Sequence, residues 1–178
     1  DKTGDQIRSP LQLRGGGEGS ETELRKYRFA LACTGEYGAS HGGTVPAVLA
    51  SLVTATNTLN SILERDLSIR LTLIPTNDLI IFLDPSTDPY TNANNGGGLL
   101  RQNEDALNNI IGLSNFDLGH VFTNGCTDVG GVVSGSTCSS GKGRGVTCHS
   151  GSNVVAVTLN IAVHEVGHQF SAGHTFNN

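Results

Sequence analysis

The stretch of sequence that says most about this chain is HEVGHQFSAGH, residues 164–174. The apolar run around its start, residues 154–170, predicts a helix that places His164 and His168 one turn apart on one face. Two imidazoles in this arrangement can bind one Zn²⁺ ion at about 2.0–2.1 Å. Glu165 can then reach a water at an open position of the metal without being a ligand itself.

A third imidazole follows at His174, six residues after His168. It cannot lie on the same helical face, so the helix must end and the chain must bend back. Gly173 tolerates such a bend. Three histidine ligands leave one position open, which is typical of a catalytic rather than a structural zinc site. The alternative is a histidine-rich end of an amphipathic helix, with Glu165 merely in solvent.

The segment resembles the long zinc-binding signature of the metzincin metallopeptidases, HExxHxxGxxH. Residues 27–37, 42–73 and 116–133 resemble the reprolysin-like (adamalysin-like) branch of that clan, in forms found in secreted bacterial proteins. The His-Thr-Phe sequence at 174–176 is also similar to pappalysin-type metzincins, so a pappalysin-like peptidase is the alternative.

The resemblance implies a zinc-dependent endopeptidase. His164, His168 and His174 would hold one catalytic zinc ion, and Glu165 would act as general base towards a zinc-bound water. The implied fold is an α/β (α+β) metzincin-like domain: a twisted five-stranded mixed sheet with one antiparallel edge strand, packed on two long helices. The substrate is a protein or peptide.

The sequence departs from the family pattern at two places. Ser171 stands where the signature has glycine, so either Ser171 adopts a left-handed backbone or the turn shifts towards Gly173. The family also has a Met-containing turn beneath the zinc, and this chain has no Met. We therefore expect an associated C-terminal segment of several tens of residues. A latent or inactive zinc-binding fragment that binds a partner without cleaving it is the competing hypothesis.

The stretch Thr127–Val133 is similar to the edge strand that forms the upper rim of a metzincin cleft. An extended peptide can pair with such an edge, main chain to main chain. The expected substrate-binding residues are Val129, Gly130, Gly131 and Val132. The alternative is an ordinary hairpin strand.

Hydrophobic periodicity predicts the remaining organisation. Residues 1–26 are polar and glycine-rich, which is typical of a linker or of an activation segment beside a removed pro-region, and we therefore expect a zymogen. Residues 27–178 are expected to form the upper part of the catalytic domain, without the C-terminal part that carries the Met-turn. Thr44 is the expected N-cap of a long helix. The expected strands are 29–32, 67–74, the apolar run 78–83, 116–122, 129–133 and 145–148, and the expected helices are 45–66 and 99–111.

Composition limits the class of protein. The net charge is −5 and no run of Lys or Arg occurs, which argues against a nucleic-acid partner. No stretch of 18 apolar residues is present, so we expect no membrane span. The four cysteines, Cys33, Cys126, Cys138 and Cys148, are consistent with two disulfides and secretion. We expect Cys138 and Cys148 to be oxidised, with a bridge across the Gly/Ser-rich residues 124–152, although the pairing stays open.

Other polar residues give weaker signals. Asp84, Asp88, Asn92 and Asn94 could form a Ca²⁺ loop, but their spacing fits no known pattern. His120 is either a fourth ligand or, as we prefer, a hydrogen-bonded strand histidine. The expected surface or loop residues are His41, His149, Lys142 and Arg144.

Overall fold

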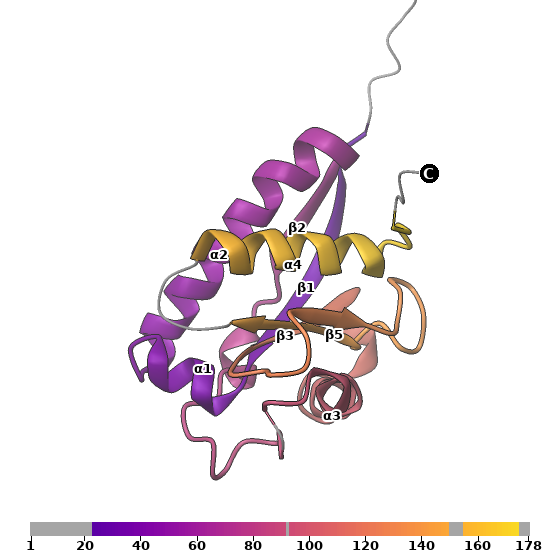
Figure 1. Ribbon diagram of the computed structural model, residues 1–178. Coiled ribbons are helices and arrows are strands. Elements are labelled where there is room, and N and C mark those ends of the chain that lie inside the picture. Colours follow the sequence, from indigo (N-terminus) through magenta and orange to yellow (C-terminus); the bar gives the residue numbers. More distant parts are fainter. Residues whose placement is uncertain (1–22, 92, 150–154, 175–178) are drawn as a thin grey trace, which may run out of the picture.

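The structure is a computed structural model that describes residues 23–91, 93–149 and 155–174 (Figure 1). The predicted linker or activation segment falls almost entirely outside these residues. The elements in chain order are β1 (Arg25–Cys33), α1 (Gly35–Ser40), α2 (Val45–Leu67), β2 (Ile69–Leu73), the 3₁₀ helix η1 (Asn77–Ile80), α3 (Gly96–Ile110), the 3₁₀ helix η2 (Leu113–Asn115), β3 (Leu118–Asn124), β4 (Gly131–Val133), β5 (Gly145–His149) and α4 (Val155–Gln169).

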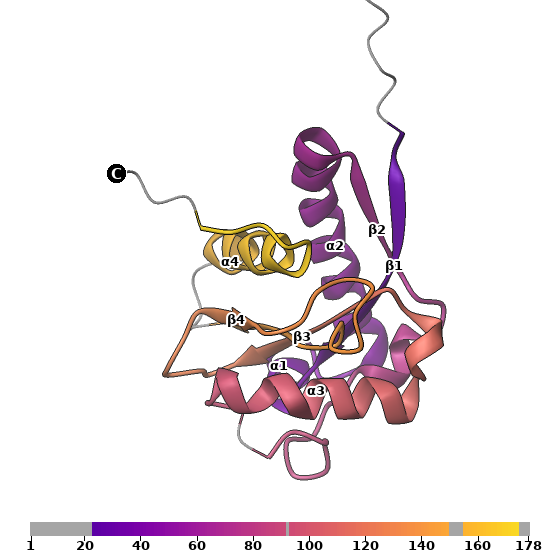
Figure 2. The same cartoon turned by 90° about the vertical axis from the view of Figure 1, so that its right-hand side faces the viewer.

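The five strands form one sheet in the order β2-β1-β3-β5-β4. The pairs β1–β2, β1–β3 and β3–β5 are parallel, whereas β4 runs antiparallel to β5 at the edge. The predicted mixed sheet with one antiparallel edge strand is therefore confirmed. β2 forms one edge of the sheet and the short β4 forms the other. Figure 2 shows β4 beneath α4.

Helices cover both faces of the sheet, and successive side chains of β1 point alternately into the two hydrophobic cores that result. Phe29, Leu31 and Cys33 face one core, formed with α2 and α4. Ala30 and Ala32 face a second core, formed with α3. Figure 2 shows α4 and α3 on opposite sides of the strands. The two long helices expected on the sheet are α2 and α4, and α3 adds a third layer.

Helix α2 forms as the sequence predicts. The Thr44 side chain accepts a hydrogen bond from the main-chain N–H of Ala47, and a proline occupies the first turn. Its buried stripe runs from Val48 through Leu52 and Leu59 to Leu63. Among the described residues, α2 alone is long and apolar enough to cross a membrane. Length and composition are weak evidence for a membrane span, because a core helix passes the same test. The buried face of α2 packs on the sheet.

Two asparagine side chains make the hydrogen bonds that a neighbouring strand would otherwise make with the main chain of the sheet. The Asn60 amide accepts from Leu71 N–H and donates to the Leu71 carbonyl, both at 2.8 Å, and so covers the free edge of β2. The Asn77 amide does the same for Leu31 of β1, at 3.0 and 2.9 Å. Asn77 continues the hydrogen bonding of β1 beyond the end of β2.

Two local expectations differ from the structure. The apolar run at 78–83 is not a strand: η1 occupies its start, and a single bridge joins Ile81 to Cys33. β1 begins at Arg25, four residues before the predicted strand 29–32. In addition, helix α1 was not predicted, because six residues are too few to show helical periodicity.

The cysteine prediction is confirmed in part. One disulfide joins Cys126 and Cys148 across the Gly/Ser-rich stretch, with Cα atoms 5.4 Å apart. The expected oxidation of Cys138 is wrong, because Cys138 is an exposed free thiol and Cys33 is a buried one. Cys33 lies in the core beside the Phe82 carbonyl, and burial raises its pKa to about 12.

The Cys126–Cys148 bridge should stabilise the fold measurably. Replacing both residues with serine is expected to lower the free energy of unfolding by about 3 kcal/mol, because the bridge closes a loop of 22 residues. Urea denaturation measures this change, with Cys138→Ser as the control of unchanged stability. Native thiol labelling should modify Cys138 alone. Labelling of Cys126 without reductant would contradict the assignment.

Candidate metal centre

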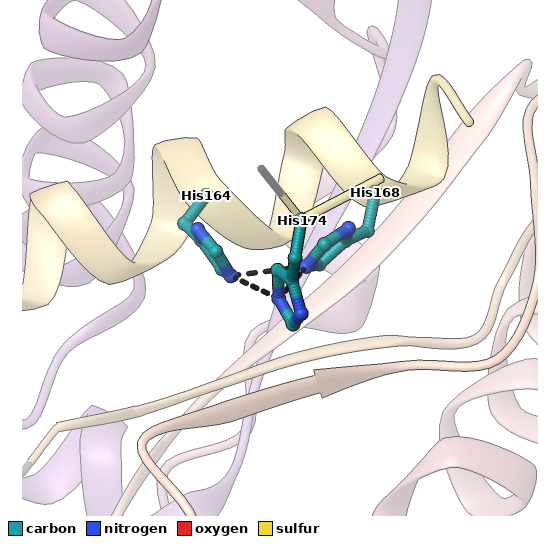
Figure 3. Close-up of side chains that lie close together, drawn as sticks. All are labelled: His164, His168 and His174. Atoms are coloured by element: carbon teal, nitrogen blue, oxygen red, sulfur yellow. Dashed lines mark hydrogen bonds between the residues drawn. The ribbon is translucent and has the colours of Figure 1, made fainter. Parts of the chain in front are cut away.

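Three histidine nitrogens converge at the end of α4 (Figure 3). The Nε2 atoms of His164 and His168 are 3.0 Å apart, those of His168 and His174 2.9 Å, and those of His164 and His174 3.1 Å. The sequence prediction that these three side chains meet is therefore realised in the geometry. They are the one group of metal-binding type among the described histidines, cysteines and carboxylates.

This triangle has the chemistry of a possible metal-ligand set rather than of a hydrogen-bond network. A neutral imidazole nitrogen either donates or accepts, so three mutually facing Nε2 atoms cannot all be satisfied by one another. His168 Nδ1 lies 2.7 Å from the Ala172 carbonyl, which can only accept. His168 Nε2 thus carries a lone pair aimed at the other two rings. Two nitrogens on one tetrahedral zinc lie about 3.3 Å apart, close to the observed separations.

The turn after α4 brings His174 back to the helix. The Ala172 N–H donates to the Gly167 carbonyl at 3.0 Å, as in a Schellman motif, and Ser171 adopts the left-handed conformation with φ 68°. The sequence left two alternatives, a left-handed Ser171 or a turn shifted towards Gly173. The structure shows the first: Ser171 is the left-handed residue, at a cost of about 1 kcal/mol relative to glycine. Gly173 has an ordinary φ.

Glu165 lies beside the histidines but faces the sheet. Its side chain is 6% exposed, and it packs directly against the backbone of Gly131. A Cβ built on Gly131 would lie only 2.5 Å from Glu165 Cγ. Burial raises the pKa of the Glu165 carboxyl, and the nearby His168 and His174 oppose that rise. The carboxylate is thus held between α4 and β4.

The main chain of β4 offers a free edge. The Cys148 N–H donates to the Gly130 carbonyl, and the Ser134 N–H donates to the Arg144 carbonyl. Because hydrogen bonding alternates along an antiparallel pair, the N–H and C=O groups of Gly131 and Val133 point away from β5. No described strand pairs with that side of β4.

The four residues predicted to bind substrate have different surroundings. Gly130 and Gly131 lie under α4, next to Ile161 and Glu165. Val129 and Val132 instead point towards Gly96 at the start of α3. Of the four, the two glycines therefore lie against α4, the helix that carries His164 and His168.

His168 lines two clefts. One, of about 520 Å³, is also lined by the end of α2, by α4 and by Ala172, Gly173 and His174. The other, of about 640 Å³, is lined by residues of the 133–144 segment, several of them serines. All three histidines therefore border the first cleft, and His168 borders both.

His120 is not a ligand. It is fully buried, with Nδ1 at 2.9 Å from Gln169 Oε1 and Nε2 at 2.8 Å from Thr147 Oγ1. The preferred prediction, a strand histidine satisfied by hydrogen bonds, is confirmed. Sequence reasoning missed Gln169; the available signal was an amide following His168 on the sheet-facing side of an apolar helix.

The remaining candidates have structural roles. Asp84 accepts hydrogen bonds from Ser86, and Asp88 accepts from the N–H groups of Gly35 and Tyr90, so this loop gives no support for Ca²⁺; Asn92 is outside the described residues. Arg144 is not a free surface charge, because it pairs at 2.7 Å with the buried Glu104. Lys142 lies over the Phe116 ring, His41 stacks on Tyr37, and His149 ends β5.

Comparison with known proteins agrees with this geometry. The model of the reprolysin-like metallopeptidases of family M12B matches residues 49–175, which include Glu165 and all three histidines. The match covers most of the chain and favours the reprolysin-like branch over the pappalysin-like alternative. No curated protein gives a significant match.

Proposed function

Since the chain belongs to the reprolysin-like metallopeptidases of family M12B, a zinc-dependent family, we propose that it is an endopeptidase whose zinc is held by His164, His168 and His174. The observation that carries this proposal is the convergence of the three Nε2 atoms within 3.1 Å of one another. Zinc bound there supplies a Lewis acid for the scissile carbonyl.

Glu165 is the proposed general base. It follows a ligand directly, yet it points towards β4, so its carboxylate stays free to take a proton from the attacking water and pass it to the leaving amine. Burial raises the pKa of its carboxyl above the ordinary value, which favours accepting a proton.

The β4 edge is the proposed substrate-aligning element. A peptide that pairs with the outward main-chain groups of Gly131 and Val133 would run past Glu165. Glycine at 130 and 131 leaves the room that α4 needs to lie close to this edge. The two clefts at His168 would then receive the peptide on either side of the scissile bond.

Secretion is part of the proposal. The support is the Cys126–Cys148 disulfide. Disulfides form and persist in oxidising compartments and are rare in cytosolic proteins. Removal of a pro-region and association with a C-terminal segment are likewise proposed, from the family resemblance alone.

Metal analysis tests the proposal directly. After dialysis, wild type should retain one zinc per chain and cleave a quenched peptide, and His168→Ala should lose the metal together with the activity. His41→Ala is the matched control, because His41 lies at the end of α1, stacked on Tyr37. Zinc near zero in wild type would refute the metal site. One zinc with no cleavage would instead favour the latent fragment.

A further inference from the structure

Gln169 directly follows His168 but points the other way. Successive residues of a helix are about 100° apart, so the residue after a metal-facing side chain can face the sheet. Gln169 is fully buried, at 0% exposure, whereas His168 is partly open. The last turn of α4 therefore presents one side chain to the metal centre and the next to the core.

The buried amide of Gln169 is satisfied by β3. Its Nε2 donates to the Gly119 carbonyl at 2.8 Å, which leaves Oε1 to accept from His120 Nδ1 at 2.9 Å. His120 Nε2 then accepts from the hydroxyl of Thr147 in β5 at 2.8 Å. Every polar atom of this chain of side chains has a partner of the correct kind.

The imidazole of His120 stays neutral in this network. Burial lowers its pKa to about 4, against a smaller opposite effect of the Gln169 hydrogen bond. A neutral ring keeps one donor and one acceptor, so the direction of hydrogen bonding from Thr147 to Gln169 is fixed near neutral pH.

Two further features join the end of α4 to its surroundings. The Gln169 carbonyl accepts from both the N–H and the hydroxyl of Thr137, at 2.8 and 3.1 Å. At Gly145 a Cβ would lie 2.3 Å from His120 Nδ1 and 2.6 Å from Gln169 Oε1, so only glycine leaves room for this hydrogen bond. The last turn is thus tied to β3, β5 and the 134–144 segment.

We propose that Gln169, held by His120, is a positioning residue for the metal centre. Its hydrogen bonds fix the position and the rotation of the last turn of α4 relative to β3. The positions of His168 and of the turn that leads to His174 follow from this. The proposal rests on the proposed function, because it assumes that these histidines bind zinc. Gln169 touches neither metal nor substrate in this role; it acts through the helix.

The test compares Gln169→Met with Asn77→Leu. Both replace a buried amide that makes two hydrogen bonds to a strand, but Asn77 holds β1 from η1, away from α4. Gln169→Met should raise the zinc dissociation constant about tenfold, as measured by chelator competition, since loss of a supporting partner costs 10–100-fold. It should also change the visible absorption of the Co²⁺-loaded protein. Asn77→Leu should lower the melting temperature and leave both metal readouts unchanged.

Thr147→Val keeps the test decisive if Gln169→Met does not fold. Valine retains the shape of threonine but removes the donor to His120 Nε2, and it should raise the zinc dissociation constant by a smaller factor than Gln169→Met does. Metal readouts equal to wild type in the folded variants, or equally altered in Asn77→Leu, would overturn the positioning role. Wild type that binds neither Zn²⁺ nor Co²⁺ would instead refute the proposed function.

Discussion

Glu165→Gln should lose at least about 10²-fold of peptidase turnover while keeping one zinc per chain. Glutamine has the shape of glutamate, so it can occupy the narrow space between α4 and Gly131. It cannot accept a proton from water, however, and the three imidazoles that hold the metal are unchanged. Turnover of a quenched peptide and zinc content, measured on the same sample, test both parts.

Glu64→Gln is the control for this prediction. Glu64 lies on α2 and pairs with Arg70 at 2.7 Å on a partly exposed surface, so its loss should change turnover less than twofold. Near wild-type turnover of Glu165→Gln would remove Glu165 from the mechanism. Loss of zinc from that variant would mean that the carboxylate organises the ligands rather than the water.

The elements that the sequence predicted are those with a long local pattern. The stripe along α2 and the capping of Thr44 appear within one continuous segment, and the structure confirms both. The spacing of His164 and His168 belongs to a single helix in the same way. The position of His174 needed only a turn, and that turn is closed by contacts within residues 167–172.

The features that escaped prediction depend on tertiary contacts. Four cysteines allow three pairings, and the choice of Cys126 with Cys148 follows from the approach of two segments that β5 brings together. The partners of the Gln169 side chain, Gly119 and His120, are 50 and 49 residues away in sequence. Which main-chain groups of β4 stay free also depends on its register with β5, which leaves those of Gly131 and Val133 pointing outwards.

Gly131→Ala tests how the sheet edge confines the proposed base. The new Cβ would lie 2.5 Å from Glu165 Cγ and 2.8 Å from Oε1, closer than real contacts allow. Either the carboxylate rotates away or β4 moves outwards, and a misplacement of about 1 Å can cost 10²-fold in rate. We therefore expect turnover to fall 10–100-fold, with one zinc retained. Gly97→Ala is the control, because its nearest neighbour would be 3.5 Å away, in ordinary contact.

The double variant separates displacement of the base from damage to the substrate edge. If Gly131→Ala acts by moving the Glu165 carboxylate, it should lower the residual turnover of Glu165→Gln by less than about threefold, because the function it disturbs is already lost. Losses that multiply would show that Gly131 contributes to peptide alignment independently of Glu165. Wild-type turnover in Gly131→Ala would show that the carboxylate can leave its space beside β4 without consequence, and that its burial there has no part in catalysis.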